Sequence, residues 1–430
     1  MTDRTWGLRT RALHAGTPPD AATGARAQPI YASTSFVFTD TQDAASLFAL
    51  QKYGTIYSRI ANPTVAAFEE KMASLDGGIG AVAAASGLAA EFLVFAALCG
   101  SGDHIVSAAS LYGGTITQLD VTLRRFGVDT TFVAGTDPAD YAAAITDRTR
   151  CVYAEVVSNP SGEVADLAGL AEVAHAAGVP LVVDATTVTP WICRPIEHGA
   201  DIVVHSATKF LGGHGTTLGG VVVEAGTFNW GNGRFPQMTE PVSSYGGLSW
   251  WDNFGEYGFL TKLRSEQLRD IGAALAAPSA FQLIQGVETL PQRMDAHLAN
   301  AHAVAHWLEA DERISYVRWA GLASHPHHAR ALRYTPAGPG AVFSFGVRGG
   351  RAAGQKFIES VQLCSHLANI GDVRTLVIHP GSTTHQQLSS DQLAAAGVPA
   401  DLVRISVGLE DVEDILFDLD QALTAATKEP

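Results

Sequence analysis

The chain has 430 residues, of which 47% are hydrophobic, and its 28 Lys and Arg against 43 Asp and Glu give a formal net charge of −15. Such a chain can bury a large core and divide into two or three globular units. The acidic balance argues against a nucleic-acid partner, so a phosphate site would have to be built locally from amides and hydroxyls. The four cysteines lack CxxC spacing and no run is long enough to span a membrane, so we expect a cytoplasmic protein with reduced thiols and no membrane partner.

Residues 1–60 show little hydrophobic periodicity, which predicts an arm that lies on another part of the molecule or assembly. From about Ala81, short apolar runs alternate with helical patterns and predict an α/β layer, a mostly parallel sheet sandwiched by helices. We place this large domain at residues 61–265. The predicted strands cover 104–106, 128–133, 151–157, 181–183 and 202–204, and a predicted helix covers 167–177.

The remainder of the chain has a different pattern. Segment 229–247 is rich in Gly and Pro and is predicted to be a long loop, a feature that is usually functional. Ala-rich and Leu-rich stretches after about Thr261 predict helices, and spaced apolar runs predict strands. We expect helices at 268–277, 295–308 and 412–425 and strands at 341–347 and 402–407. These elements predict a smaller α+β domain over residues 266–430.

Polar residues follow the apolar runs at four places. In a parallel sheet, ligands bind beyond the carboxyl ends of the strands, so these residues are candidates for a site. Three runs end with Glu155 and Asn159, with Asp184, and with Ser206, Thr208 and Lys209. The fourth, ASGL at 85–88, precedes a helical stretch, so the amides of Ser86, Gly87 and Leu88 are placed to hold an anion at a helix N-terminus.

One cofactor, pyridoxal phosphate, requires this set of groups. It needs a lysine for its Schiff base, a carboxylate for its pyridine nitrogen and donors for its phosphate. Lys209 is the candidate Schiff-base lysine and Asp184 the candidate pyridine partner, while the hydroxyls of Ser206 and Thr208 are candidate phosphate donors. In SLYGG at 110–114, Tyr112 is the candidate for stacking on the ring.

Six segments resemble the Cys/Met-metabolism family of fold-type I pyridoxal phosphate enzymes, and weaker similarity extends from about residue 8 to residue 425. The segments are YSRIANPT (57–64), ASGLAA (85–90), SLYGGT (110–115), SNP (158–160), VDATTVTP (183–190) and HSATKFLGGHG (205–215). Within this family, other segments are most similar to the sulfhydrylases that act on O-acetylhomoserine. These are ALHAG (12–16), TGARAQPIY (23–31), LFALQKYGTIYSR (47–59), GRFPQMTEP (233–241) and NIGDVRTLVIHPGSTTHQQL (369–388).

The resemblance implies an oligomer with shared sites. Tyr57 and Arg59 match a pair that reaches across a subunit interface to the cofactor phosphate, and Tyr57 is also expected beside the substrate. A homo-oligomer is therefore expected, a tetramer built from dimers whose active sites use residues of both chains.

The resemblance also implies residues within one chain. Arg404 matches an arginine that binds the substrate α-carboxylate, a role that suits its fork of donors. Asn369 falls where many relatives have a serine near the lysine. Thr186 is kept as a cofactor contact, although VDATTVTP departs from the common VDNTFATP at Ala185 and at two later positions. Glu155 and Asn159 match residues that line the cofactor ring.

The activity implied is a γ-replacement in which O-acetyl-L-homoserine and sulfide give L-homocysteine and acetate. Lys209, Asp184 and Tyr112 are the expected catalytic residues. Cystathionine γ-synthase or methionine γ-lyase chemistry is the alternative, and a catalytically silent binding protein is a further one. The resemblance leaves open whether the acyl group of the substrate is acetyl or succinyl. It also leaves open whether the thiol is sulfide, methanethiol or cysteine. No metal is expected, because His325, His327 and His328 have no accompanying carboxylate or fourth ligand.

Overall fold

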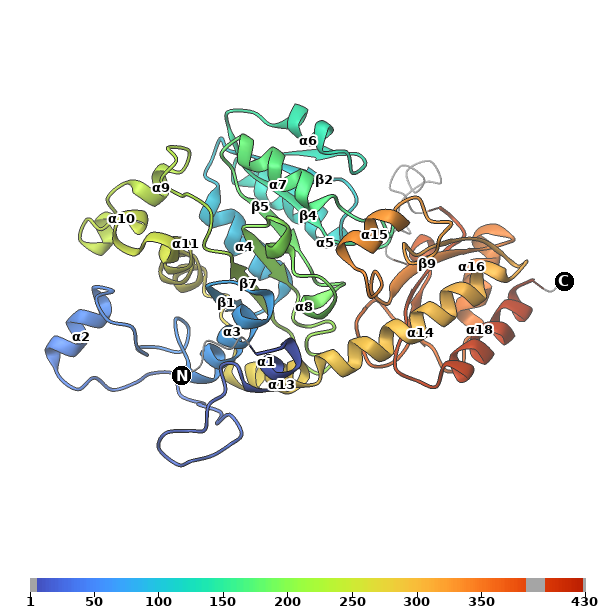
Figure 1. The fold of residues 1–430 in the computed structure, drawn as a ribbon, viewed down its shortest axis with the longest axis horizontal. Helices are drawn as coiled ribbons and strands as arrows, with labels where there is room; N and C mark the ends of the chain where they lie inside the picture. The colour runs from blue at the N-terminus through green and yellow to red at the C-terminus, as the bar shows by residue number, and fades with distance from the viewer. Residues whose placement is uncertain (1–5, 384–398, 428–430) are drawn as a thin grey trace.

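A large sheet forms the centre of the molecule. The computed structural model describes residues 6–383 and 399–427 (Figure 1). Within these residues the sheet has seven strands in the order β1-β7-β6-β5-β4-β2-β3. The strands are β1 (Gly80–Ala84), β2 (His104–Ala108), β3 (Asp129–Val133), β4 (Thr149–Glu155), β5 (Leu181–Asp184), β6 (Ile202–His205) and β7 (Gly220–Glu224). Strand β7 is antiparallel to β1 and β6, whereas all other neighbours are parallel, so the predicted mostly parallel α/β sheet is confirmed.

The helices that accompany this sheet begin and end at residues suited to those positions. The helices are α3 (Pro63–Asp76), α4 (Gly87–Leu98), α5 (Gly113–Thr117), α6 (Pro138–Ala144), α7 (Leu167–Ala176), α8 (Thr189–Ile192), α9 (Pro236–Thr239), α10 (Trp250–Phe254) and α11 (Gly258–Lys262). In α3, the Asn62 side chain caps the first turn and Gly77 ends the helix with a φ of 81°. Helices α3 and α4 both pack on β1 and β7, while α7 packs on β4 and β5.

A second sheet occupies the C-terminal part of the chain, on the right of Figure 1. Its strands in the described residues follow the order β10-β11-β12-β9-β8, and only β10 and β11 pair in parallel. They are β8 (Ile314–Arg318), β9 (Val342–Val347), β10 (Ser365–His366), β11 (Leu376–Ile378) and β12 (Leu402–Ser406). The helices here are α14 (Leu290–Ala310), α15 (His328–Tyr334), α16 (Gly350–Ser360) and α18 (Val412–Thr427), whereas α12 (Arg269–Ile271) and α13 (Ala277–Glu288) lie with the large sheet, where α13 packs on α3. This is the α+β arrangement that the sequence predicts.

Two predictions for individual segments were wrong. The helix expected over 268–277 ends at Ile271, because Gly272 adopts a φ of 79° and the chain then runs extended. There the Ala273 carbonyl accepts a hydrogen bond of 2.8 Å from the Ala85 amide, so the segment borders β1 instead of continuing the helix. The predicted loop over 229–247 contains α9 and a 3-10 turn at Ser243–Tyr245. It is packed rather than open, since Trp230 and Phe235 are buried.

The N-terminal arm leaves apolar side chains uncovered. Its helices are α1 (Leu8–His14), which packs on α3, and α2 (Thr41–Phe48), which projects away from the central sheet (Figure 1). Val37 is 99% exposed, Tyr53 76% and Phe48 61%. A cluster of large exposed apolar residues is a feature of surfaces that meet another protein. None of the helices in the described residues is both long and apolar enough to cross a membrane.

Candidate active site

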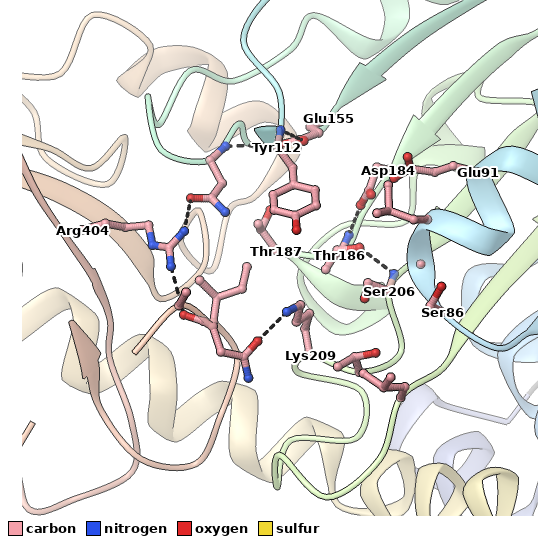
Figure 2. A pocket seen from close by; sticks show the side chains of 18 residues that line it. Ser86, Glu91, Tyr112, Glu155, Asp184, Thr186, Thr187, Ser206, Lys209 and Arg404 are labelled. Carbon is pink, nitrogen blue, oxygen red and sulfur yellow. Dashed lines mark hydrogen bonds between the residues drawn. The ribbon is translucent and has the colours of Figure 1, made fainter. Parts of the chain in front are cut away.

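A cavity of about 220 Å³ lies where the carboxyl ends of β2, β4, β5 and β6 meet the C-terminal part of the chain (Figure 2). The parallel strands bring their terminal side chains to one edge, as the sequence predicts. Strand register places Glu155 directly beside Asp184. Thirteen of the predicted site residues line the cavity: Ser86, Gly87, Leu88, Tyr112, Glu155, Asn159, Asp184, Thr186, Ser206, Thr208, Lys209, Asn369 and Arg404.

One end of the cavity combines a helix N-terminus with hydroxyl groups. Ser86 caps α4, and its hydroxyl accepts a hydrogen bond of 3.1 Å from the Ala89 amide. Gly87 is required here, because a Cβ at this position would lie 2.5 Å from the Cβ of Ser206. This close approach brings the hydroxyls of Ser206 and Thr208 to the positive end of the helix dipole. Amide and hydroxyl donors at a helix N-terminus are suited to a phosphate group.

Asp184 lies deeper in the cavity, at the end of β5. Its Oδ1 accepts a hydrogen bond of 2.6 Å from the Thr186 amide, and the Thr186 hydroxyl in turn accepts one of 2.8 Å from the Ser206 amide. Burial raises the pKa of the Asp184 carboxyl above its ordinary value, although the Thr186 hydrogen bonds and His205 act in the opposite direction. A buried carboxylate of this kind is suited to a cationic ring nitrogen, which would supply the missing counter-charge.

His205 lies on the buried side of Asp184, where it pairs with a second carboxylate. Its Nε2 lies 3.0 Å from Oδ2 of Asp76, and both side chains are fully buried. Burial alone would lower the pKa of His205, but Asp76 raises it above the ordinary value. The sequence analysis did not single out this pair, because its members lie far apart in the chain.

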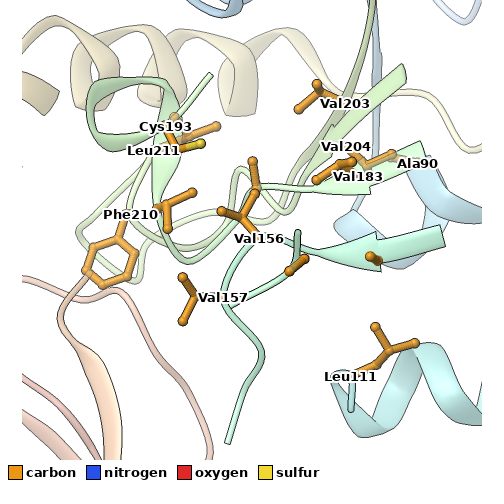
Figure 3. Close-up of a cluster of buried hydrophobic side chains, with 14 of the residues drawn as sticks. Ala90, Leu111, Val156, Val157, Val183, Cys193, Val203, Val204, Phe210 and Leu211 are labelled. Carbon is orange, nitrogen blue, oxygen red and sulfur yellow. The ribbon is translucent and has the colours of Figure 1, made fainter. Parts of the chain in front are cut away.

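Lys209 enters the cavity from a tight turn after β6. Phe210 and Leu211 anchor this turn in the core beside Val156 and Cys193 (Figure 3). The buried guanidinium of Arg293 clamps the same turn through hydrogen bonds of 2.7 Å to the Phe210 carbonyl and 3.1 Å to the Leu211 carbonyl.

The chemical surroundings of Lys209 favour a neutral amine. Its Nζ donates a hydrogen bond to Asn369 Oδ1, which is an uncharged acceptor (Figure 2). Burial, and secondarily the positive charge of Arg404, lower the pKa of Lys209 to about 8. An amine with such a pKa has a far larger neutral fraction near neutral pH than an ordinary lysine and can act as a nucleophile or a base.

Arg404 approaches the cavity from β12, on the side opposite Asp184 (Figure 2). Its guanidinium donates a hydrogen bond of 3.1 Å to the Asn369 carbonyl and one of 3.5 Å to Asn159 Oδ1. Burial lowers the pKa of Arg404 to about 10. Glu410 on the same part of the chain does not pair with Arg404, since its carboxylate accepts hydrogen bonds from the Thr375 amide and hydroxyl.

The ring of Tyr112 lies over the cavity (Figure 2). The Tyr112 amide donates a hydrogen bond of 2.6 Å to Glu155 Oε1, while the Asn159 amide donates one of 3.1 Å to Glu155 Oε2. Gly114 packs beneath the ring, because a Cβ there would lie 2.4 Å from a ring carbon of Tyr112. Glu155 therefore ties the loop that carries Tyr112 to the end of β4.

Tyr57 and Arg59 are not among the residues that line the cavity of their own chain. Tyr57 is 42% exposed, and the guanidinium carbon of Arg59 lies 5.4 Å from its ring centroid. Their assignment to the site of a second subunit stays a prediction. Segment 384–388 of the resemblance lies outside the described residues.

Comparisons with known proteins were made over the whole chain. Residues 9–424 match the family described as Cys/Met metabolism PLP-dependent enzyme. The chain belongs to this family. It is 51% identical to sulfhydrylase FUB7 of Fusarium oxysporum f. sp. lycopersici, covering 97% of this chain and 98% of the relative. It is also 46% identical to O-acetyl-L-homoserine sulfhydrylase of Leptospira meyeri, covering 98% of this chain and 97% of the relative.

A solved structure carries the same fold. A putative O-acetylhomoserine (thiol)-lyase from Campylobacter jejuni is 33% identical, covers 97% of this chain and 100% of its own, and has a TM-score of 0.94. That structure contains N'-pyridoxyl-lysine-5'-monophosphate. The predicted fold-type I architecture and the predicted pyridoxal phosphate cofactor are thereby confirmed for this member of the Cys/Met family.

The cavity of this family member also contains residues that the sequence analysis missed as site residues. They are Glu91, Thr187, Leu218, Ala368 and Ile370. Thr187 was noted only as a departure from the common motif. Glu91 could have been recognised as a site candidate from the sequence, since it is the only charged residue in the otherwise apolar helix sequence GLAAEFLVFAAL. The apolar members gave no signal, because nothing distinguishes them from core residues.

The pKa of Lys209 predicts how the cofactor-free enzyme captures pyridoxal phosphate. Because only the neutral amine attacks a carbonyl, the rate of covalent capture should rise with pH around a midpoint near the Lys209 pKa of about 8. Stopped-flow absorbance of the bound cofactor measures this rate.

Two variants serve as controls. Lys209→Ala should give neither the adduct absorbance nor turnover. Arg404→Gln removes a nearby positive charge and should move the midpoint upward. A midpoint near 10.5, the ordinary value for lysine, would contradict the assignment.

Proposed function

We propose that this enzyme catalyses γ-replacement of O-acetyl-L-homoserine by sulfide, giving L-homocysteine and acetate. The observation that carries the proposal is that a half-buried amine, Lys209, and a half-buried guanidinium, Arg404, face one cavity whose opposite side is acidic. The relatives named as sulfhydrylases, one of them specifically for O-acetyl-L-homoserine, support this activity.

The cavity residues fit pyridoxal phosphate. In this proposal, the amides at Ser86, Gly87 and Leu88 and the hydroxyls of Ser206 and Thr208 hold the phosphate. Asp184, oriented by Thr186, pairs with the ring nitrogen, and Tyr112 covers the ring with support from Glu155. When bound, the cofactor supplies an electron sink for the electron pair left when the substrate loses its α-proton.

Arg404 would orient the substrate. Its guanidinium is half-buried and held by the Asn369 carbonyl, so it is preorganised to bind the α-carboxylate of an amino acid. Asn159 and Asn369 flank this position and supply further polar contacts. With its carboxylate fixed at Arg404, the substrate places its α-carbon on the same side of the cavity as Lys209.

Lys209 would move protons during the reaction. Its neutral amine takes the α-proton, and the Nζ, held by a single amide acceptor, is free to deliver and collect protons along the chain toward the β-carbon. Acetate then leaves from the γ-carbon with its bonding electron pair, and hydrosulfide forms the new carbon–sulfur bond, so the reaction consumes no oxidant or reductant.

Product analysis tests this activity. With O-acetyl-L-homoserine and sulfide, we expect homocysteine and acetate to form in equal amounts, measured by thiol labelling and chromatography. O-succinyl-L-homoserine should be a poorer substrate by kcat/KM, and methanethiol or cysteine should replace sulfide less well. Release of 2-oxobutyrate as the main product would instead indicate γ-elimination, and formation of cystathionine from cysteine would indicate a γ-synthase.

We also propose that the working unit is a dimer with shared sites, two of which form a tetramer, and that it acts in the cytoplasm. The exposed apolar surface of the arm around Val37, Phe48 and Tyr53 supports a contact with a second chain. In this arrangement residues 1–60 serve a neighbour, residues 61–265 bind the cofactor and residues 266–430 close the site. The cysteines of the described residues are free, which suits a reducing compartment.

Subunit mixing tests the shared site. Arg59→Ala and Lys209→Ala should each be inactive, because one lacks a phosphate contact and the other the reactive amine. In a random mixture, half of the dimers are hybrids with one intact site each, so about a quarter of wild-type activity should return.

The matched control is a mixture of Lys209→Ala with Asp184→Ala. Both changes affect the cavity of the chain that carries them, so this mixture should remain inactive. Absence of recovery in the Arg59→Ala mixture would contradict a site completed by a second chain.

A further inference from the structure

Glu91 is a buried carboxyl group that the reaction scheme above does not use. It lies on α4, four residues after Gly87, so it faces the cavity below the helix N-terminus. The residue is only 3% exposed. Figure 2 shows its side chain directed toward Asp184. With Glu155 beside Asp184 in the sheet, three carboxyl groups share this side of the cavity.

In the described residues Glu91 has polar neighbours but no cationic partner. The Thr115 hydroxyl lies 3.1 Å from Oε1 and 2.9 Å from Oε2, and the hydroxyl of Tyr153 is a second polar neighbour. Within residues 6–383 and 399–427, no Lys, Arg or His forms an ion pair with Glu91. His205 is paired with Asp76 and acts on Asp184 rather than on Glu91.

A carboxylate in these surroundings would be costly. It would be desolvated, it would have no counter-charge, and it would face the charge of Asp184 at close range. Burial, followed by the charge of Asp184, raises the pKa of Glu91 well above the ordinary value. Because the Thr115 hydroxyl has one proton to donate, at least one oxygen of a protonated Glu91 remains available as a donor.

Asp184 is the acceptor within reach of that proton. Both carboxyl groups line the same side of the cavity and point toward each other (Figure 2), and a proton shared from Glu91 would lower the pKa of Asp184. We propose that Glu91 is a positioning residue that remains a neutral acid and donates a hydrogen bond to Asp184, which keeps Asp184 an anion and a weak base toward the cofactor ring nitrogen. This inference rests on the proposed pairing of Asp184 with that nitrogen.

Under this proposal the two carboxyl groups, Asp184 and Glu91, have different roles. Asp184 supplies the negative charge, and Glu91 decreases the affinity of Asp184 for a proton. The proton is thereby retained on the ring nitrogen, where it makes the ring a better electron sink. Glu155 is excluded from this role, because its oxygens already accept hydrogen bonds from the Tyr112 and Asn159 amides.

The test compares two cofactors on the cofactor-free enzyme. Dissociation constants are measured for pyridoxal phosphate and for its 1-deaza analogue, in which carbon replaces the ring nitrogen. The preference for pyridoxal phosphate is the ratio of the dissociation constant of the analogue to that of pyridoxal phosphate. This ratio isolates the contribution of the nitrogen contact, because the phosphate and lysine contacts are common to both ligands. This readout does not require turnover.

Glu91→Gln keeps a neutral donor toward Asp184 and an acceptor for Thr115, so the preference for pyridoxal phosphate should stay within about threefold of wild type. Glu91→Leu has similar volume but no donor, and the preference should fall about tenfold, as expected for loss of one hydrogen bond to a charged group. If Glu91→Leu does not fold, Glu91→Met, which also lacks a donor, is read in the same way.

Leu93→Ala is the matched control on the same helix. Leu93 is fully buried and is not among the cavity residues, so this change should weaken both ligands equally and leave the ratio unchanged.

A ratio unaffected by Glu91→Leu would overturn the inference. An equal fall of the preference in Glu91→Gln and Glu91→Leu would also overturn it, because loss of preference on neutralising the side chain identifies Glu91 as an anion that attracts the protonated ring nitrogen. A wild-type ratio near one would show instead that Asp184 does not contact the nitrogen, and the proposed placement of the cofactor would fail with it.

Discussion

The site depends on a half-buried amine that has no carboxylate partner among the described residues. Lys209 donates its hydrogen bond to an amide oxygen of Asn369, and its charged neighbour is the cation Arg404. A carboxylate in place of Asn369 would hold the amine as an ammonium ion and remove its reactivity. Desolvation of the Lys209 amine is unfavourable. The turn that carries Lys209 is nevertheless held in place, because Phe210 is buried in the core and Arg293 donates a hydrogen bond to the Phe210 carbonyl.

Low pKa alone does not distinguish Lys209. Burial also lowers the pKa of Lys71 to about 8, yet the Lys71 Nζ donates a hydrogen bond of 2.7 Å to the Ala12 carbonyl. Lys71 therefore fastens the arm to α3. What makes Lys209 a candidate for covalent chemistry is its position on a cavity with acids on one side and cations on the other, a polarity that can orient both a cofactor and an amino acid.

Much of this site could be predicted from sequence because parallel strands end at one edge. Asp184 and Ser206 each follow an unbroken apolar run, so their convergence follows from the fold class. Arg404 and Asn369 required the family resemblance, since residues from a second sheet reach the cavity through tertiary packing that no local pattern encodes. The helix expected over 268–277 was wrong because its small residues suit either conformation and Gly272 decides between them. Glu91 was missed because its role arises only where α4 meets β5.

The most direct test of this account is to reduce the holoenzyme with borohydride and map the modified peptide by mass spectrometry. Borohydride fixes the carbon–nitrogen link between the enzyme and pyridoxal phosphate, so the labelled residue identifies the reactive amine. The account predicts one pyridoxyl group per chain, attached to Lys209. Labelling of another lysine, such as Lys71 or Lys262, with Lys209 unmodified, would contradict it.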